Sequence, residues 1–391
     1  MSTRAANPVS PEDYRALAAR RLPRFLFDYV DGGAGDERTL TANVAEFAAL
    51  HSRQRVLAGS DHIDTATTLA GQACALPLAL APVGLAGLTA ARGEAQAARA
   101  ASAAGVPFTL STVGICPLAE VRAASTQPFW FQLYMLRDRG AVQALLDDAW
   151  SAGCRTLIFT VDLPLPGIRR RDLRHGVDAH GLKPALHKAR QVLSRPRWLW
   201  NVALGGRPLR FGCLARQVPE ARNLNAFKAW VDSQFDPDVS WRDIEWLRTR
   251  WSGKLLLKGI LEPADAEQAV KLGADGIVVS NHGGRQLDSV AASITKLPEI
   301  AARVGTQTEV LVDGGVRSGT DIFKALALGA RGVLIGRPWV WALAARGEPG
   351  VRDLLALFER ELRMAMMLTG VTRIADIGTR HLDGLEPPAQ G

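Results

Sequence analysis

The sequence has few of the groups that stabilise small secreted proteins or bind structural metals. Its four cysteines, Cys74, Cys116, Cys154 and Cys213, are scattered and form no C-x-x-C pair, which argues against a zinc site and a redox dithiol. Residues 1–20 lack the apolar segment of a signal peptide, and no run of about 18 apolar residues occurs anywhere. We therefore expect a protein of a reducing cytoplasm, with no metal and no membrane-spanning segment.

Acidic residues are missing from one long segment. Between Lys183 and Pro219 there are eight lysines and arginines and no aspartate or glutamate, and these eight equal the whole net charge of +8. Trp198 and Trp200 lie in the same segment, so residues 183–216 are suited to an anionic membrane surface. A solvated loop whose tryptophans cover the barrel is an equal alternative, and nucleic acid is disfavoured because no binding motif accompanies the charge. Further apolar residues of the segment are Leu199, Leu209 and Phe211.

The remaining composition is typical of a globular protein, with 47% hydrophobic and 22% charged residues. Short apolar segments rich in β-forming residues occur eight times, and alanine- and leucine-rich segments of helical spacing separate most of them. This alternation predicts an α/β fold of the (β/α)8 TIM-barrel type, which commonly exceeds about 200 residues as one domain. The expected strands are Leu76–Ala81, Phe108–Ser111, Phe129–Tyr134, Thr156–Val161, Leu255–Lys258, Gly276–Ser280, Glu309–Val312 and Gly332–Ile335. Expected helices include Gly93–Ala104, Ala141–Ala152, Pro263–Leu272 and Gly319–Leu328.

The chain is interpreted as one domain over residues 1–391. Residues 1–75 are expected to form an N-terminal helical cap, whose first helix begins at Pro11 after Ser10. Residues 76–380 are expected to form the barrel, and residues 178–240 form a long basic, tryptophan-containing insertion after the fourth strand. The glycines of Gly32-Gly33-x-Gly35 follow a helix and not a strand, so they predict a turn and not a dinucleotide-binding loop.

Polar residues are concentrated where the expected strands end. Barrel enzymes place their chemistry on the loops that follow the strands, so these residues are expected to form one ring around the site. The ring comprises Pro82, Val83, Gly84, Ser111, Thr112, Gln132, Tyr134, Thr160, Asp162, Lys258, Ser280, Asn281, His282, Asp313, Gly314, Gly315, Arg317, Gly336 and Arg337.

The last part of this ring predicts an anion site. Gly314, Gly315 and Gly336 offer backbone N–H groups, and Arg317 and Arg337 add positive charge. Because barrels often bind phosphate after strands seven and eight, a phosphorylated cofactor or substrate is expected. Glycine-rich structural turns are the alternative.

The segment from Ser280 to Asp288 reads Ser-Asn-His-Gly-Gly-Arg-Gln-Leu-Asp and directly follows an apolar strand. It contains His282, an ionisable base, and Arg285, a cation that can hold a carboxylate through two hydrogen bonds. The pair indicates chemistry on a small organic acid. A histidine and an arginine whose hydrogen bonds are simply satisfied within the protein is the alternative.

From about Tyr14 to about Gly384 the chain resembles the FMN-dependent alpha-hydroxy acid dehydrogenase family, and within it the bacterial quinone-linked L-lactate dehydrogenases. The resemblance rests on many segments spread along the sequence, besides Ser280–Asp288. They are Phe25–Ala34, Leu80–Gly84, Phe108–Val113, Trp130–Tyr134, Thr160–Asp162, Lys258–Gly259 and Asp313–Gly315.

The resemblance implies roles for the site residues. His282 would be the catalytic base and Asp162 its partner, and the sequence leaves open whether the base takes the α-carbon proton or the hydroxyl proton. Lys258 would lie beside the flavin ring of FMN. The carboxylate and hydroxyl of the substrate would be bound by Tyr29, Tyr134, Arg169 and Arg285. FMN would be held by Pro82, Val83, Gly84, Ser111, Gln132, Thr160, Ser280, Asp313, Gly314, Gly315, Arg317, Gly336 and Arg337.

The implied reaction is oxidation of an L-2-hydroxy acid such as L-lactate to the 2-oxo acid, with FMN as cofactor and quinone as acceptor. Gly84 favours a dehydrogenase, since several oxidases of the family have alanine there. An oxygen-using oxidase remains an alternative. A mandelate-type dehydrogenase is another, because Val113 replaces the tryptophan of plant glycolate-oxidising relatives. No haem-binding extension is expected before Tyr14.

The family resemblance further implies a homo-oligomer, commonly a tetramer, and the basic segment suggests a peripheral protein at the cytoplasmic face of the inner membrane. Two other classes stay open. A phosphate- or FMN-dependent barrel isomerase would share the anion site, but it would not need His282, Arg169 and Arg285 around one carboxylate. A non-catalytic protein that binds membranes or nucleic acid would contain no flavin.

Overall fold

The computed structural model describes residues 8–59, 62–175, 182–216, 230, 233–234 and 236–384. Its centre is a sheet of eight parallel strands in the order β3-β10-β9-β8-β7-β6-β5-β4, and a bridge between Leu80 and Phe108 joins the two outermost strands. The predicted (β/α)8 barrel is therefore confirmed. The strands are β3 (Leu78–Leu80), β4 (Thr109–Ser111), β5 (Trp130–Leu133), β6 (Thr156–Thr160), β7 (Lys254–Ile260), β8 (Gly276–Val279), β9 (Glu309–Asp313) and β10 (Gly332–Ile335).

Side chains alternate in direction along each strand, and this explains why strands of mostly apolar sequence end in a ring of polar residues inside the barrel. Successive side chains of a strand point to opposite faces, so residues two apart share a face. The interior of the barrel is filled by one layer that includes Trp130, Ile158, Leu256, Val278, Leu311 and Leu334. Two positions further along the same strands come Gln132, Thr160, Lys258, Ser280, Asp313 and Gly336. The polar ring is therefore the next interior layer, at the carboxyl ends of the strands.

The opposite end of the barrel is closed by an antiparallel hairpin of β1 (Thr67–Leu69) and β2 (Gln72–Cys74). Leu69, Ala70 and Cys74 of the hairpin pack with the interior layer, and the backbone N–H of Ala70 donates to Glu309 Oε2 at 2.8 Å. The expected helical cap over residues 1–75 thus ends in a hairpin that the sequence analysis did not include.

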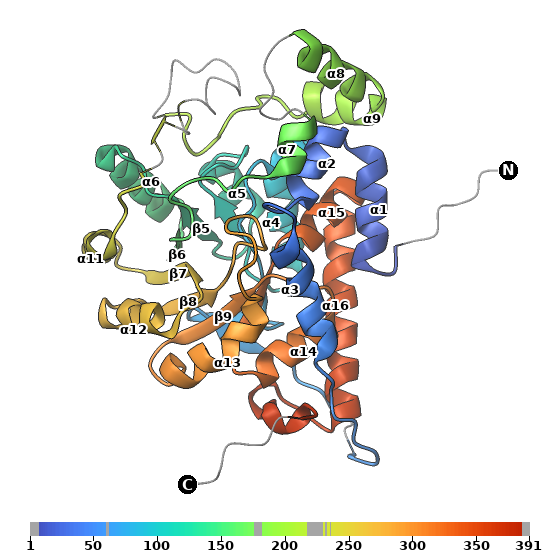
Figure 1. Ribbon diagram of the computed structural model, residues 1–391, viewed down its shortest axis with the longest axis vertical. Helices are drawn as coiled ribbons and strands as arrows, with labels where there is room; N and C mark the ends of the chain where they lie inside the picture. The colour runs from blue at the N-terminus through green and yellow to red at the C-terminus, as the bar shows by residue number, and fades with distance from the viewer. Residues whose placement is uncertain are drawn as a thin grey trace, which may run out of the picture.

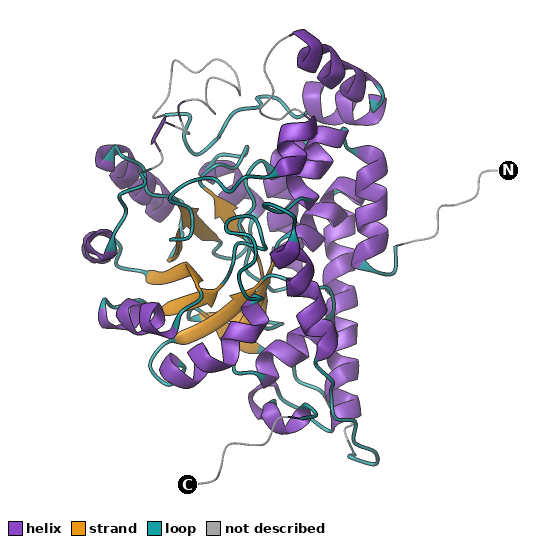
Figure 2. Ribbon diagram, in the orientation of Figure 1, coloured by secondary structure: helices purple, strands orange, loops and turns teal. Residues whose placement is uncertain are grey.

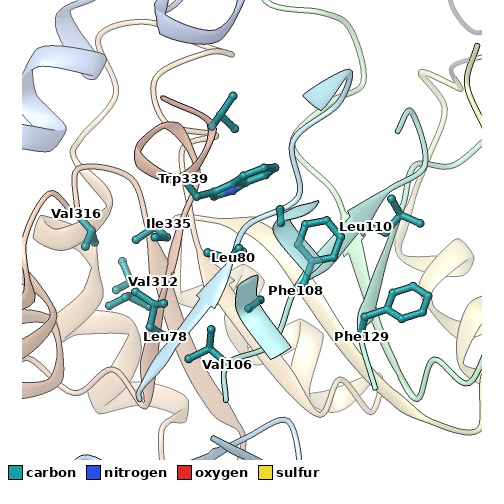
Figure 3. Packing of buried hydrophobic residues seen from close by; sticks show 14 of the residues in the cluster. Leu78, Leu80, Val106, Phe108, Leu110, Phe129, Val312, Val316, Ile335 and Trp339 are labelled. Carbon is teal, nitrogen blue, oxygen red and sulfur yellow. The ribbon is translucent and has the colours of Figure 1, made fainter. Parts of the chain in front are cut away.

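Helices surround the strands (Figure 2). Trp339 of α15 lies against the place where the barrel closes, with its ring 6.0 Å from that of Phe108 and its indole N–H donating to the carbonyl of Ala81 at 3.2 Å (Figure 3). The outer helices are α4 (Gly93–Ala103), α5 (Leu118–Ala124), α6 (Arg139–Ser151), α11 (Trp241–Arg250), α12 (Pro263–Lys271), α13 (Ser293–Val304), α14 (Gly319–Ala327), α15 (Arg337–Arg346) and α16 (Glu348–Thr369). Short helical turns are η1 (Ala86–Leu88), η3 (Ile374–Asp376) and η4 (Thr379–His381).

Three helices precede the barrel, namely α1 (Pro11–Arg21), α2 (Arg24–Asp31) and α3 (Arg38–Ala49). The hydroxyl of Ser10 accepts a hydrogen bond from the backbone N–H of Asp13, which confirms the predicted start of α1. The segment from Gly32 to Gly35 is a turn, as predicted.

Helix α7 (Arg170–His175) precedes the insertion. The described part of the insertion forms α8 (Leu182–Leu193), α9 (Pro196–Trp198) and η2 (Leu199–Leu204), while residues 176–181 and 217–229 lie outside the described ranges. Helices α8 and α9 form a small lobe at one end of the molecule, beyond α2 and α7 and away from the strands (Figure 1). Trp198 is not turned to solvent, because its indole N–H donates to the carbonyl of Leu88 at 2.7 Å. Phe211 is buried as well, whereas Trp200 is exposed. None of the described helices is long and apolar enough to span a bilayer.

Candidate active site

A cavity of about 820 Å³ opens at the carboxyl ends of the strands. This volume lies within the range of about 300–1,000 Å³ that is usual for sites of small molecules and cofactors. Most of the predicted site residues line it, and they come from both the barrel loops and α2. The lining set is Tyr29, Pro82, Val83, Gly84, Tyr134, Thr160, Arg169, Lys258, His282, Arg285, Asp313, Gly314, Gly315, Arg317, Gly336 and Arg337. The other four, Asp162, Ser111, Gln132 and Ser280, are hydrogen-bonded to members of this set or to one another.

The imidazole of His282 is paired with a carboxylate. Its Nδ1 lies 2.8 Å from Asp162 Oδ1, which leaves the Nε2 side of the ring for the cavity that His282 lines. Burial opposes the charge of Asp162, but His282 and Lys258 outweigh it and hold the pKa of Asp162 below its ordinary value. Asp162 therefore stays ionised, and it can orient the ring and stabilise a proton that His282 accepts.

The backbone at His282 is left-handed, with φ of 58°. Left-handed non-glycine residues are uncommon and often mark functional sites. The hydroxyl of Ser280 accepts the backbone N–H of His282 at 3.0 Å, and Asn281 Oδ1 accepts that of Gly284 at 3.1 Å. These two bonds fix the turn that directs the imidazole toward Asp162.

Lys258 is buried with its ammonium group fully engaged by protein. Its Nζ lies 2.9 Å from Asp313 Oδ2 and donates to the hydroxyl of Ser280 at 2.9 Å. Burial alone would lower the pKa of Lys258, yet Asp313 and Asp162 hold it above the ordinary value. Asp313 was predicted to contact the cofactor directly, and the structure shows that its carboxylate neutralises Lys258.

Three other cations of the site are half-buried, and none of them has such a partner within the part of the chain that the structure describes. Among the described residues, no carboxylate forms an ion pair with Arg285, Arg317 or Arg337, although all three line the cavity. Burial and the neighbouring Arg169 lower the pKa of Arg285 to about 10. Burial likewise lowers the pKa of Arg317 and Arg337. Burying unpaired charge is costly, so this cavity is built to receive anions.

Backbone carbonyl groups hold two of these guanidinium groups in place. Arg285 Nη1 donates to the carbonyls of Tyr29 and Gly32 at 2.7 and 3.0 Å. Arg337 donates to the carbonyls of Asp31, Gly32 and Gly283 at 3.1, 2.8 and 2.8 Å. The end of α2 and the turn after it are thus part of the site, because they orient cations without cancelling their charge.

Tyr29 lies between two cations. The guanidinium carbons of Arg169 and Arg285 are 5.5 and 5.2 Å from the centre of its ring. Arg169 differs from Arg285 in having a carboxylate partner, since its Nε lies 2.9 Å from Asp172 Oδ2. Burial is the main cause that raises the pKa of Tyr134, and the negative charge of Asp162 adds to it. The hydroxyl of Tyr134 therefore stays protonated and can donate a hydrogen bond.

Three polar side chains on the adjacent strands β4, β5 and β6 are linked in a row by hydrogen bonds. The hydroxyl of Ser111 donates to Gln132 Oε1 at 2.9 Å, and Gln132 Nε2 donates to the hydroxyl of Thr160 at 3.0 Å. Thr160 lines the cavity while Ser111 and Gln132 lie behind it. The row can present hydrogen-bonding groups to the edge of a flat polar ring.

The glycines serve packing more than the sequence analysis proposed. A Cβ on Gly284 would lie 2.5 Å from the backbone nitrogen of Leu40, and one on Gly315 would lie 2.0 Å from the carbonyl oxygen of Asn43. Close approach of α3 therefore requires these glycines. Gly336 is different, because a Cβ there would meet nothing nearer than 4.0 Å and would project into open space.

Several structural partners of the site were not predicted. Gln286 Nε2 donates to the carbonyls of Asp162 and Leu165 at 2.7 and 2.9 Å, which ties the loop after β6 to the segment that contains His282. Arg171 pairs with Asp31 at 2.8 Å and also with Glu37. The only sequence signal for Asp172 is its position three residues after Arg169.

Comparison with known proteins decides the family. A family model for FMN-dependent dehydrogenases matches residues 18–384. The chain belongs to this family. An L-lactate dehydrogenase of Caulobacter sp. (strain K31) is 54% identical, covering 94% of this chain and 96% of its own length. An L-lactate dehydrogenase of Chromohalobacter salexigens is 51% identical, covering 95% of this chain and 94% of its own length.

Two solved structures share the fold. The crystal structure of the monotopic membrane protein (S)-mandelate dehydrogenase aligns with a TM-score of 0.90 at 33% identity, over 97% of this chain and 100% of that one. Mandelate oxidase with (S)-4-hydroxymandelic acid aligns with a TM-score of 0.82 at 39% identity, over 96% and 98% of the two chains.

As a member of the FMN-dependent dehydrogenase family, the protein is an oxidoreductase with FMN as its cofactor. The cavity suits that molecule. Open space above Gly336 at the N-terminus of α15, beside the unpaired Arg317 and Arg337, matches a phosphate group. The hydrogen-bonding row that ends at Thr160, together with Lys258, matches the polar edge of an isoalloxazine ring.

Proposed function

We propose that the protein oxidises L-lactate to pyruvate, with FMN as cofactor. In this reaction the 2-hydroxy acid loses two electrons and two protons and becomes a 2-oxo acid. The observation that supports it most is the convergence of the His282–Asp162 pair and the unpaired Arg285 in one cavity. The L-lactate dehydrogenases of the compared bacteria are 51–54% identical to this chain over nearly its full length.

In this proposal each side chain has a definite task. Arg285 and Arg169 bind the substrate carboxylate, and Tyr29 and Tyr134 donate hydrogen bonds to it and to the hydroxyl. His282 accepts a proton from the substrate at Nε2, and Asp162 stabilises the imidazolium that results. FMN supplies the two-electron acceptor when it is bound. Lys258 places positive charge where the cofactor gains electrons.

We further propose that electrons leave to a membrane quinone and that residues 183–216 bind the protein to an anionic bilayer, at the cytoplasmic face of the inner membrane. Exposed apolar side chains support membrane contact, among them Leu186, Leu193 and Trp200. The likeness to a monotopic membrane mandelate dehydrogenase agrees with it. A single domain and a tetrameric assembly, as is common in the family, complete the proposal.

Membrane binding can be tested by charge reversal. Replacing Arg190 and Arg197 by glutamate is expected to weaken binding to anionic phospholipid vesicles by at least about 30-fold, at about 1 kcal/mol for each basic residue near the surface. The matched control reverses Arg352 and Arg360, which are exposed on α16 away from α8. Equal losses in both double variants would show that net charge, and not this segment, determines binding.

A mandelate-type substrate is the second candidate, and the wall of the cavity favours it. Gly84 and Val113 both line the cavity, where a tryptophan at position 113 would fill space that the smaller valine leaves. Solved relatives with mandelate in their names share the fold. An oxygen-using oxidase differs in the acceptor and would produce peroxide in air at the rate of turnover.

Anaerobic titration tests cofactor, reaction and substrate together. The purified protein is expected to be yellow, and L-lactate is expected to bleach its flavin absorbance more efficiently than glycolate or (S)-mandelate. Preference for mandelate would support the second candidate. A yellow protein that none of the three acids bleaches would indicate an isomerase, and a colourless one a binding protein. His282→Ala is expected to stay yellow and unbleached.

A further inference from the structure

The cavity continues beyond the polar site along two helical segments. Phe25 and Leu26 line it one turn before Tyr29 on α2, and a helical turn advances about 5.4 Å. Leu173 lines it on α7, where its backbone N–H donates to the carbonyl of Arg169 at 3.2 Å. Each of these apolar residues is thus one turn away from a residue that we assign to substrate binding.

The basic insertion forms the far wall of this extension. Gln191 Oε1 of α8 accepts the backbone N–H of Phe25 at 2.8 Å, and Trp198 of α9 donates to the carbonyl of Leu88 at 2.7 Å. Lys188 of α8 also lines the cavity. We name this extension the outer compartment and define it by Phe25, Leu26, Leu88, Leu173, Lys188 and Phe211.

The chemistry of the outer compartment does not match the hydroxy acid. Lactate has a single methyl group besides its carboxylate and hydroxyl, and the residues assigned above already bind the carboxylate and the hydroxyl. The outer compartment instead offers two aromatic rings, three aliphatic side chains and one ammonium group. Apolar walls with one polar group are typical of a site for a flat, mostly apolar ligand.

The surface next to the outer compartment is apolar and basic. Leu173 is 58% exposed while it lines the cavity, so it belongs to both surfaces. Leu186 and Trp200 of the insertion are 69% and 72% exposed. A molecule dissolved in a bilayer could therefore pass from lipid to the cavity along apolar side chains without crossing water.

We propose that the outer compartment is the binding site for the ring of a lipid-soluble quinone, which enters beside Leu173. This inference rests on the proposed function. It locates the second half-reaction, the reduction of the quinone, in the outer compartment. Oxidation of the hydroxy acid releases two electrons and two protons, and reduction of the quinone to a quinol consumes two of each. FMN, when bound, would supply the redox chemistry that connects the two half-reactions. Lys188 lines the same compartment.

The test compares two electron acceptors in variants of the intact, FMN-loaded protein. One acceptor is a quinone with a short, water-soluble side chain, and the other is ferricyanide, a hydrophilic anion. Leu173→Asp places a charge at the entrance, and its position is exposed enough to tolerate the change. Leu88→Phe narrows the compartment from the opposite side. Leu368→Asp is the matched control, because Leu368 is exposed on α16, does not line the cavity and lies outside the insertion.

The expected result is a KM for the quinone that rises about tenfold in Leu173→Asp and in Leu88→Phe, while the KM for ferricyanide stays within about twofold; a tenfold change corresponds to about 1.4 kcal/mol. Leu368→Asp is expected to change neither. A quinone KM that stays constant in both test variants overturns the proposal. So does a raised KM for (S)-mandelate with an unchanged quinone KM, which would assign the compartment to an aromatic substrate side chain.

A binding measurement separates this inference from the proposed function. A photoreactive azido-quinone, irradiated with the oxidised protein in the absence of hydroxy acid, is expected to label the peptides that contain Leu88, Leu173 or Phe211. Labelling elsewhere, with normal bleaching by L-lactate, refutes the compartment alone. If neither L-lactate nor mandelate bleaches the flavin, the proposed function fails and this inference fails with it.

Discussion

Asp162→Asn is the substitution that tests the proposed proton acceptor most directly. Asparagine has nearly the shape of aspartate and can still accept a hydrogen bond from His282, but it has no charge. The main chain is expected to stay in place, because Gln286 donates to the backbone carbonyl of residue 162 at 2.7 Å whatever its side chain is. The change therefore removes the negative charge next to the imidazole and little else.

The expected loss follows from the 2.8 Å contact between Asp162 Oδ1 and His282 Nδ1. Hydrogen bonds to charged groups contribute about 1.5–3 kcal/mol, and each 1.36 kcal/mol is a factor of ten in rate. Because imidazolium forms only as the substrate loses its proton, this contribution belongs to the transition state. Flavin reduction by saturating L-lactate is expected to slow by about ten- to 150-fold.

The measurement is anaerobic stopped-flow absorbance of the flavin after mixing with L-lactate. Asp148→Asn is the matched control, since Asp148 pairs with Arg216 at 2.8 Å outside the cavity. The control is expected to react like the parent protein. If Asp162→Asn slows flavin reduction by less than about threefold, the charge of Asp162 does not assist proton transfer and His282 is not the acceptor in the form that we propose.

Three further substitutions or conditions test other parts of the site. Gly284→Ala is expected to destabilise the fold by about 1–3 kcal/mol, because its φ is 72° and the new Cβ would meet backbone at 2.5 Å; Gly378→Ala, with nothing within 4 Å, is expected to leave the thermal unfolding midpoint unchanged. Arg285, whose pKa is about 10, is a cation below that pH, so kcat/KM for L-lactate is expected to fall as pH rises through 10. At saturating L-lactate, kcat is expected to fall less, because a bound carboxylate favours the charged form of Arg285. Gly84→Ala is expected to reduce kcat/KM for L-lactate, because the new Cβ would lie 2.7 Å from Val113 Cγ2. Adding Val113→Ala is expected to restore activity. A double variant that is no more active than the single variant would exclude this steric cause.

The fold was largely predictable because it depends on local periodicity. Eight apolar segments separated by helical ones have few other arrangements available, and strand alternation then places Lys258 two residues after Leu256 on the same interior face. The β1–β2 hairpin was missed for a physical reason. Its strands have three residues each, too few to show alternation, and its stability comes from side chains such as Leu69 inside the barrel.

Apart from the pair of His282 and Asp162, the pairings of the site residues were not predicted. The sequence placed Lys258, Asp313 and Arg337 in one ring, yet it did not reveal that Asp313 neutralises Lys258 or that Arg337 has no carboxylate partner among the described residues. Those facts depend on contacts between segments far apart in the chain, such as Arg337 with the carbonyl of Gly32. Local sequence patterns do not show which distant segments come into contact, so only the structure shows which charged side chains of the cavity are paired.

That charge balance also explains why one cavity suits both a phosphorylated cofactor and an organic acid. The pairs of Lys258 and Arg169 with aspartates are internally neutral, whereas Arg285, Arg317 and Arg337 leave three positive charges for ligands to match. A phosphate monoester brings about two negative charges and a carboxylate brings one. Because carbonyl groups and not carboxylates orient Arg285 and Arg337, these cations keep their full attraction for anions. In the proposed function, the phosphate of FMN and the carboxylate of the substrate together bring the three negative charges that match these three cations.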